Sequence, residues 1–281
     1  MNRIVIVTGG ASGIGRALSA EMVRRGDTVF VADINAEGAQ VAVSAMNGPG
    51  NARAVTLDVC DADAVLALVT LVHNECGRLD VIVNNAGIGL GGFAEELTVD
   101  HWNSVIDVNI RGVVNGVVAA YPLMVSQGFG HIVNTASLAG LIPSPGLTPY
   151  SMTKHAVVGL STSLRIEAAS HGVKVTAVCP GFTDTAILDS PVMPGLPPTS
   201  ASGRGRELAA ALPGGLYDAD LLALDILEGI DRNRRLVIAP RSARVAALAN
   251  RLVPAVVERQ VRKGIDSMRR AAVETLASTS R

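Results

Sequence analysis

Residues 4–15, IVIVTGGASGIG, join a β-branched run directly to a glycine-rich turn and the start of a helical pattern. Glycines in such a turn permit positive φ and let backbone amides approach a pyrophosphate, which the helix N-terminus stabilises. We therefore expect a dinucleotide-binding turn, and the residues expected to contact the cofactor there are Gly9, Ser12, Gly13, Ile14 and Gly15.

Two other chemistries do not fit the sequence. A Walker loop needs Lys followed by Ser or Thr where this chain has Arg16 and Ala17, which disfavours phosphoryl transfer. A G-x-S-x-G nucleophile turn needs glycines on both sides of Ser137, but Thr135 and Ala139 stand there. A hydrolase of that type is therefore disfavoured as well.

Apolar β-branched runs alternate with helix-length segments along most of the 281 residues. This alternation predicts a single α/β domain with a Rossmann-like, doubly wound parallel sheet between two layers of helices. The expected strands are Ile4–Val7, Thr28–Val31, Ala54–Leu57, Val81–Val83, His131–Asn134, Val173–Val178 and Leu236–Ile238. The expected helices are Ile14–Arg25, Ala36–Met46, Ala62–Glu75, Asp100–Asn109, Val113–Ser126 and Tyr150–His171.

Several features favour a cytoplasmic protein without a metal. No uninterrupted apolar run reaches the length of a membrane span, and no secretion signal precedes the strand-like run at Ile4. Cys60, Cys76 and Cys179 form no C-x-x-C pair, so we expect buried thiols in a reducing compartment and no zinc site. The five histidines show no ligand spacing and are expected to be structural or exposed.

The charge is distributed unevenly. Residues 232–281 hold twelve of the 24 Lys and Arg and three of the 25 Asp and Glu, which gives this part +9 and the preceding residues −10. An apolar stripe with arginines around it predicts a basic amphipathic helical extension over 241–281. Its members are Val257, Val261, Ile265, Met268, Ala272 and Leu276.

Three interpretations of this extension remain open. Packing on the same chain or a sister subunit is the leading interpretation, and covering the substrate cleft is the second. Contact with an anionic membrane surface is the third, because basic amphipathic helices suit such surfaces. Nucleic-acid binding is not favoured, because the body is acidic and aromatic residues are not interleaved with the basic ones.

Asp33 lies eighteen residues beyond Gly15, at the end of the second expected strand. A carboxylate there can accept hydrogen bonds from a ribose 2′-hydroxyl and repels a 2′-phosphate, which favours NAD over NADP. The alternative is an ordinary helix N-cap or loop residue. Asp58 and residues 84–87, NNAG, close the third and fourth strands, at the sheet edge where ligands of such folds bind.

Tyr150 and Lys154 are four residues apart, thirteen residues after Ser137. On a helix, positions i and i+4 share one face, so the ammonium would lie beside the phenol and favour phenolate. Tyrosine ordinarily has a pKa near 10, and a neighbouring cation makes it a usable general acid and base at neutral pH. The alternative is an ordinary surface helix start.

Taken together, these residues resemble the short-chain dehydrogenase/reductase family over residues 1–240. The shared motifs are T-G-x-x-x-G-x-G at 8–15, Asp58-Val59, Asn84 to Gly87, Asn109 opening N-I-R-G, Ser137, Y-S-M-T-K at 150–154 and Pro180-Gly181. The resemblance implies a sheet in the order 3-2-1-4-5-6-7 and hydride transfer between a nicotinamide cofactor and a carbonyl carbon.

The resemblance also implies roles for individual residues. Tyr150 would exchange a proton with the substrate oxygen, and Lys154 would lower the pKa of Tyr150 and hold the ribose. Ser137 would donate to the substrate oxygen, and Asn109 would position a water that links Lys154 to solvent. The other residues expected to bind the cofactor are Asp58, Val59, Asn85, Ala86, Gly87, Pro180, Gly181, Thr183 and Thr185. NADP-using relatives commonly carry a basic residue where this chain has Ser12, so NAD is favoured again.

The residues expected near the substrate are apolar: Leu138, Leu141, Ile142, Pro143, Leu147 and Phe182. They favour an apolar secondary alcohol or ketone over a sugar or a polar acid. Alcohol oxidation is the expected direction, because cellular NAD is mostly oxidised. Residues 190–215 are rich in Pro, Gly and Ser, which predicts no helix and either a mobile substrate loop or an insertion without function. Arg204 and Arg206 in this segment could bind a carboxylate.

The function expected from the sequence is an NAD-dependent oxidoreductase acting on CH–OH groups, assembled as a homodimer or homotetramer. The alternatives are an NADP-dependent ketoreductase, a lyase, dehydratase or epimerase on the same fold, and a non-catalytic NAD-binding regulator.

Overall fold

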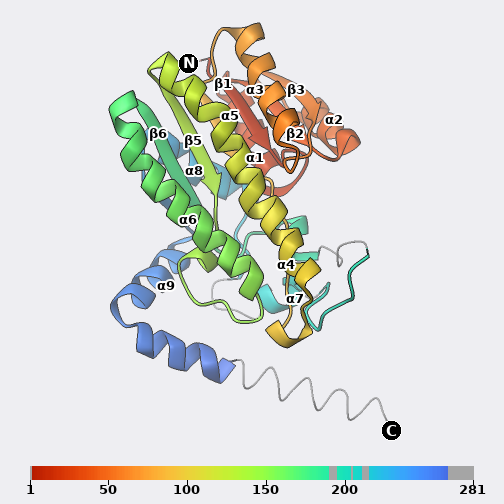
Figure 1. Cartoon of the computed structure of the whole chain (residues 1–281), viewed down its shortest axis with the longest axis vertical. Coiled ribbons are helices and arrows are strands. Elements are labelled where there is room, and N and C mark those ends of the chain that lie inside the picture. The colour runs from red at the N-terminus through yellow and green to blue at the C-terminus, as the bar shows by residue number, and fades with distance from the viewer. Residues whose placement is uncertain (1, 190–194, 204, 211–214, 265–281) are drawn as a thin grey trace.

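The computed structural model describes residues 2–189, 195–203, 205–210 and 215–264 (Figure 1). Seven parallel strands form one sheet in the order β3-β2-β1-β4-β5-β6-β7, which confirms the predicted fold. The strands are β1 (Ile4–Thr8), β2 (Thr28–Asp33), β3 (Asn51–Thr56), β4 (Val81–Asn84), β5 (Gly130–Thr135), β6 (Val173–Pro180) and β7 (Leu236–Ala239).

Both faces of the sheet are covered by helices. On one face α1 (Gly13–Arg24), α2 (Ala36–Ala45) and α8 (Ala219–Asp231) pack against alternate strand residues such as Val5 and Val7. On the other face α3 (Ala62–Cys76), α5 (Gly112–Gln127) and α6 (Thr148–Ala168) pack, and Ile6 points into that core (Figure 1). Neither side of β1 therefore faces water, which explains why its sequence is apolar throughout.

Two predicted helices prove to be one continuous run. α4 (Val99–Ile106) continues through a π-helical turn, η2 (Asp107–Arg111), into α5. By length and composition alone, residues 99–127 could cross a membrane. In this fold one side of the run packs in the core, through buried residues that include Val105, Val113, Ala120 and Met124.

Two other sequence predictions about helices are wrong. No helix was predicted over α8, although its buried residues Leu222, Ile226 and Ile230 recur every four positions. The sequence also predicted no helix within 190–215, but α7 (Gly205–Ala210) forms there, because no proline stands between Pro198 and Pro213 and the sequence GRELAA contains good helix formers. Residues 190–194, 204 and 211–214 of that segment lie outside the described residues.

Short 3₁₀ turns complete the part of the chain that the structure describes. They are η1 (Ala94–Glu96), η3 (Leu138–Gly140), η4 (Ala169–His171) and η5 (Ala186–Asp189). Among the cysteines, Cys179 is buried and Cys76 is half-buried, but Cys60 is exposed at the edge beyond β3, so the prediction of a buried thiol is wrong for Cys60.

The C-terminal extension begins with α9 (Arg241–Leu252), and residues 254–264 form a further helix at the lower end of the molecule (Figure 1). Asn250 Nδ2 donates to the Leu141 carbonyl at 3.0 Å, which ties α9 to the segment before α6. Of the predicted apolar stripe, Val257 and Val261 are half-buried. Its remaining members, Ile265, Met268, Ala272 and Leu276, lie outside the described residues.

Candidate active site

The sequence motifs meet at one edge of the sheet, beyond the carboxyl ends of β1, β4, β5 and β6. Because all strands are parallel, the residues that follow these strands come together at that edge, where open α/β sheets bind ligands. The glycine-rich turn follows β1, Asn85 to Gly87 follow β4, Ser137 follows β5 and Gly181 follows β6.

The glycine-rich turn packs closely against the loops after β4 and β6. Gly9 and Gly13 have φ of 64° and 51°, which favour glycine. A Cβ on Gly9 would lie 2.8 Å from the Ala86 Cα, and one on Gly13 would lie 3.0 Å from the Thr185 Cγ2. Ser12 is the N-cap of α1, and the first turn of α1 contains no acidic residue. A helix N-terminus with these properties suits a pyrophosphate, so the turn fits a dinucleotide.

Thr8 connects this turn to the loop after β4. Its hydroxyl accepts hydrogen bonds from the backbone N–H groups of Asn85 and Ala86, both at 3.0 Å, and donates to the Val83 carbonyl at 3.3 Å. Asn85 Nδ2 donates back to the carbonyls of Thr8 and Gly9. Thr8 was not among the predicted site residues, although it opens the T-G-x-x-x-G-x-G motif.

Asp33 is half-buried at the end of β2 and faces the glycine-rich turn. Its Oδ2 accepts from the Ala11 N–H and its Oδ1 from the Asn35 N–H, both at 2.9 Å. The alternative in which Asp33 caps a helix is wrong, because Asn35 caps α2. Each carboxylate oxygen keeps a second acceptor position, so Asp33 still fits a ribose hydroxyl.

Asp58 and Val59 follow β3 and contribute in different ways. Asp58 is exposed, and its Oδ1 accepts from the Cys60 N–H at 2.9 Å. Val59 is buried, and its carbonyl accepts a hydrogen bond from Asn115 Nδ2 at 2.8 Å. Asp58 is therefore the member of this pair with a polar group accessible at the sheet edge.

Tyr150 and Lys154 lie on the first turns of α6, as their spacing predicted. The Lys154 ammonium is buried, and its Nζ donates to the Thr135 carbonyl at 2.9 Å. The same atom lies 5.5 Å from the centre of the Tyr150 ring. Thr135 was not identified from the sequence, because its backbone oxygen is what binds the lysine.

The pKa values of the pair are governed by burial. Burial lowers the pKa of Lys154 to about 8. Burial also raises the pKa of Tyr150, and a hydrogen bond with Ser137 offsets part of that rise. The direction for Tyr150 is therefore opposite to the one expected from Lys154, because removal from water disfavours the charged phenolate.

Ser137 is the N-cap of η3 and borders Tyr150. Its Oγ accepts from the Ala139 N–H at 3.1 Å, which fixes the side chain, and its proximity to Tyr150 offsets part of the rise in the pKa of that phenol. The two hydroxyls can therefore act on the same substrate oxygen.

Asn109 is fully buried in the π-helical turn. Its Oδ1 accepts from the Ile88 N–H at 2.9 Å, and its Nδ2 donates to the Ile88 carbonyl at 3.0 Å and to Thr153 Oγ1 at 3.3 Å. A Cβ on Gly87 would lie 3.1 Å from Asn109 Oδ1 and 3.5 Å from Lys154 Nζ. Asn109 thus fixes the loop after β4 beside Lys154, and the predicted water relay through it stays a prediction.

The loop after β6 covers the glycine-rich turn. Thr183 and Thr185 are almost fully buried, and their hydroxyls donate to the carbonyls of Gly181 and Thr183. Thr185 lies against Gly13, as described above, which places this loop over the proposed cofactor position. The predicted substrate residues Leu138, Leu147 and Phe182 are all half-buried.

Two arginines, Arg204 and Arg206, were expected from the sequence to be able to bind a substrate carboxylate. Arg206 in α7 donates to Asp184 Oδ1 at 2.6 Å and to Asp189 Oδ2 at 2.8 Å. Its guanidinium is therefore engaged with acidic groups of the loop itself. Arg204 lies outside the described residues.

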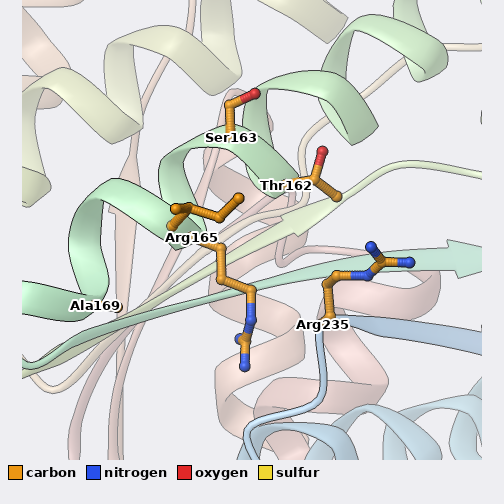
Figure 2. Close-up of a pocket in the computed structure, with 6 residues that line it drawn as sticks. Thr162, Ser163, Arg165, Ala169 and Arg235 are labelled. Carbon is orange, nitrogen blue, oxygen red and sulfur yellow. The ribbon is translucent and has the colours of Figure 1, made fainter.

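Two cavities are lined by residues other than Ser137, Tyr150 and Lys154. One of about 480 Å³ lies between α6 and the start of β7, and Arg165 and Arg235 both line it with their side chains pointing in different directions (Figure 2). Arg165 is held there by the carbonyls of Val175 and Asn233, so its role is structural. The other, of about 560 Å³, lies between residues 143–155 and the helix at 254–264, and is lined by Met152, Val261 and others.

Comparisons with known proteins identify the family of this chain. Residues 3–192 match the model of the short chain dehydrogenase family. The chain is 36% identical to the 3-oxoacyl-[acyl-carrier-protein] reductase FabG of Thermotoga maritima over 188 residues, covering 66% of this chain and 76% of that protein.

Solved structures are similar over nearly the whole chain. One is a short chain dehydrogenase/reductase of Burkholderia phymatum in complex with NAD, with a TM-score of 0.80, 31% identity, and coverage of 92% of this chain and 95% of that one. Another is a short-chain dehydrogenase of Sphingobium yanoikuyae in complex with NADPH, with a TM-score of 0.73, 27% identity, and coverage of 94% and 95%. The protein belongs to the short-chain dehydrogenase/reductase family and is an NAD(P)-dependent oxidoreductase.

Proposed function

We propose that this protein interconverts an apolar secondary alcohol and its ketone with NAD, and that Tyr150 is the general acid and base. The observation that carries the proposal is the buried Lys154 ammonium, which is fixed by the Thr135 carbonyl and lies 5.5 Å from the centre of the Tyr150 ring. The glycine-rich turn, Asp33 and the loops after β4 and β6 would hold the nicotinamide cofactor, which supplies or accepts the hydride when bound.

In ketone reduction, the Tyr150 hydroxyl donates its proton to the carbonyl oxygen as negative charge develops there. Ser137 donates a second hydrogen bond to that oxygen and stabilises the charge. Lys154 then provides a positive charge beside the phenolate that remains. Because burial raises the pKa of Tyr150, the phenol is protonated at neutral pH, which suits reduction. Oxidation requires the phenolate and is favoured as the pH rises.

The preference for NAD rests on two positions. Asp33 faces the turn with free acceptor positions and would repel a 2′-phosphate. The exposed residue beside the glycine turn is Ser12, which brings no positive charge for that phosphate. Because similar structures contain NAD in one case and NADPH in another, the choice has to be measured on this protein.

The half-buried Leu138, Leu147 and Phe182 stand near Ser137, Tyr150 and Gly181 in the sequence, and they favour a substrate that is apolar next to its carbonyl. We further propose one catalytic domain with a C-terminal extension that packs on its own chain or a sister subunit. The contact between Asn250 and the Leu141 carbonyl supports the first of these. The proposed setting is a cytoplasmic homodimer or homotetramer.

The test is turnover of apolar secondary alcohols and ketones, followed through the absorbance of the reduced nicotinamide. Tyr150→Phe is expected to reduce kcat by roughly 10²–10⁴-fold while NAD still binds. Tyr121→Phe on α5 is the matched control, since Tyr121 packs in the core and should keep full activity. Product formation without net change in nicotinamide absorbance would favour a lyase or epimerase instead. Tight NAD binding with no turnover of any substrate would favour a regulator.

A further inference from the structure

His101 on α4 is fully buried and joins two distant segments of the chain. Its Nδ1 lies 3.1 Å from the Thr98 nitrogen, and its Nε2 lies 3.0 Å from the Pro197 carbonyl oxygen. A backbone N–H can only donate and a carbonyl can only accept, so Nδ1 carries the lone pair and Nε2 the hydrogen. This neutral tautomer binds the start of α4 to residues 195–203.

Gly91 and Glu96, which precede α4 in the chain, also form hydrogen bonds with residues 195–203. Glu96 Oε2 accepts from both the backbone N–H and the hydroxyl of Ser200, at 3.2 and 2.9 Å. Thr199 Oγ1 donates to the Gly91 carbonyl at 2.6 Å. The segment is therefore attached to the chain at positions 91, 96 and 101, and only the bond from His101 comes from a fully buried side chain.

Glycines allow this segment to approach the loop before η1 closely. A Cβ on Gly91 would lie 2.8 Å from the Ala201 Cβ, and one on Gly92 would lie 2.9 Å from the Thr199 Cβ. The same loop is attached to the start of α6, because Gly92 pairs with Leu147 in a parallel bridge. Leu147 directly precedes the helix that carries Tyr150, so residues 195–203 lie next to the predicted substrate position.

We propose that His101 is a positioning residue that fixes residues 195–203 as one wall of the substrate pocket beside Leu147. It acts on substrate binding through this segment and does not touch the reacting atoms. Because α4 continues into the turn that carries Asn109, the same helix holds the pocket wall and the loop beside Lys154. The substrate readout rests on the function proposed above, but the attachment of the segment can be tested without turnover.

Two substitutions separate the two hydrogen bonds of the imidazole. In His101→Asn the amide oxygen replaces Nδ1 and can accept from Thr98, but the side chain is too short to reach Pro197. In His101→Gln the longer amide can reach the Pro197 carbonyl. His101→Asn therefore loses the hydrogen bond to the Pro197 carbonyl and keeps the one from the Thr98 N–H. His101→Gln should restore the hydrogen bond to the Pro197 carbonyl.

The first measurement is hydrogen–deuterium exchange of residues 195–203 in the apo protein. Loss of one hydrogen bond should raise exchange at Thr199, Ser200 and Ser202 by about five- to ten-fold in His101→Asn and leave it near wild type in His101→Gln. The second is steady-state kinetics with an apolar ketone. KM should rise by roughly three- to ten-fold in His101→Asn, with kcat and NAD affinity retained, since uniform binding is what is lost.

Unchanged exchange in His101→Asn would overturn the attachment. Raised exchange in His101→Asn with an unchanged KM would overturn the positioning role. The role would also be overturned if His101→Asn lost kcat, NAD affinity and thermal stability to the same extent and His101→Gln did not restore them. A wild type without any oxidoreductase turnover would refute the proposed function and the effect on KM, whereas the exchange data would still decide whether His101 holds the segment.

Discussion

Lys154 Nζ donates to the Thr135 carbonyl at 2.9 Å, and the same ammonium lies 5.5 Å from the centre of the Tyr150 ring. The lysine is thus fixed by the strand that leads to Ser137, and its charge is buried. Burial opposes charge on both partners, since the pKa of Lys154 falls to about 8 and that of Tyr150 rises. The bound cofactor and substrate complete a site whose charges are costly on their own.

The burial of Lys154 predicts an unusual dependence of stability on pH. Its pKa is about 8 in the folded state, against about 10.4 in an unfolded chain. Between these values the unfolded chain binds the proton and the folded protein does not, so this group stabilises the fold as the pH rises through that window. The free energy of unfolding of wild type relative to Lys154→Met should therefore increase from about pH 8 to about pH 10, by up to ~1.4 kcal/mol per pH unit.

The measurement is denaturant unfolding of the apo protein at several pH values. Lys174→Met is the matched control, because Lys174 is exposed on β6 and should show no such trend. A flat difference between wild type and Lys154→Met across this range would contradict the assignment of a buried ammonium.

Substitution of Gly9 is predicted to weaken cofactor binding in addition to lowering stability. Gly9 and Gly77 have similar positive φ, 64° and 72°, but a Cβ would meet the Ala86 backbone only at Gly9 and meets nothing within 4 Å at Gly77. Gly77→Ala should cost about 1 kcal/mol of stability from backbone strain alone and leave NAD affinity unchanged. Gly9→Ala should cost more and weaken NAD binding, because the Ala86 loop must shift. Unfolding curves and calorimetric NAD titration measure both, and equal NAD affinity in the two variants would refute the role of the turn.

The chain's sequence predicted the sheet and the motifs that follow its strands because those signals are local. Strand 1 and the glycine turn are contiguous, and the i, i+4 spacing of Tyr150 and Lys154 holds on any helix. The strand order came instead from the family resemblance. The contacts that the sequence did not reveal join positions far apart in the chain. Thr8 binds the loop at 85–86, and His101 binds Pro197 across 96 residues.

Burial accounts for the other differences. From the sequence, Lys154 was expected to lower the pKa of Tyr150, but the spacing of two residues carries no information about the water that the fold removes from both. Similarly, His101 looked like a structural histidine. It is indeed fully buried, but its partner lies in a segment whose position could be known only from the folded chain.

Asp33 gives a prediction about cofactor choice. Asp33→Ser removes the negative charge and keeps a hydroxyl that can accept from Ala11, so NAD should bind roughly ten-fold more weakly and NADP more tightly. Asn35→Ala is the control, since it removes the cap of α2 and should cost about 1 kcal/mol of stability without changing the ratio of the two affinities. The measurement is the dissociation constants of NAD and NADP for each protein at one ionic strength. A wild type that binds NADP as well as NAD would contradict the proposed preference.

His131 on β5 predicts sensitivity to acid. The residue is buried, and its Nε2 lies 2.8 Å from Thr176 Oγ1. Burial, together with the charges of Lys174, Arg165 and Arg3, lowers its pKa to about 3, against about 6.5 in an unfolded chain. Between these values only the unfolded chain takes up the proton, so stability falls as the pH drops below about 6.5, by up to ~1.4 kcal/mol per unit. His131→Gln keeps a donor for Thr176 but cannot be protonated, and it should lose less stability in acid than wild type. The exposed His155→Gln should behave as wild type in denaturant unfolding at the same pH values, and parallel losses in all three proteins would show that His131 does not cause the acid sensitivity.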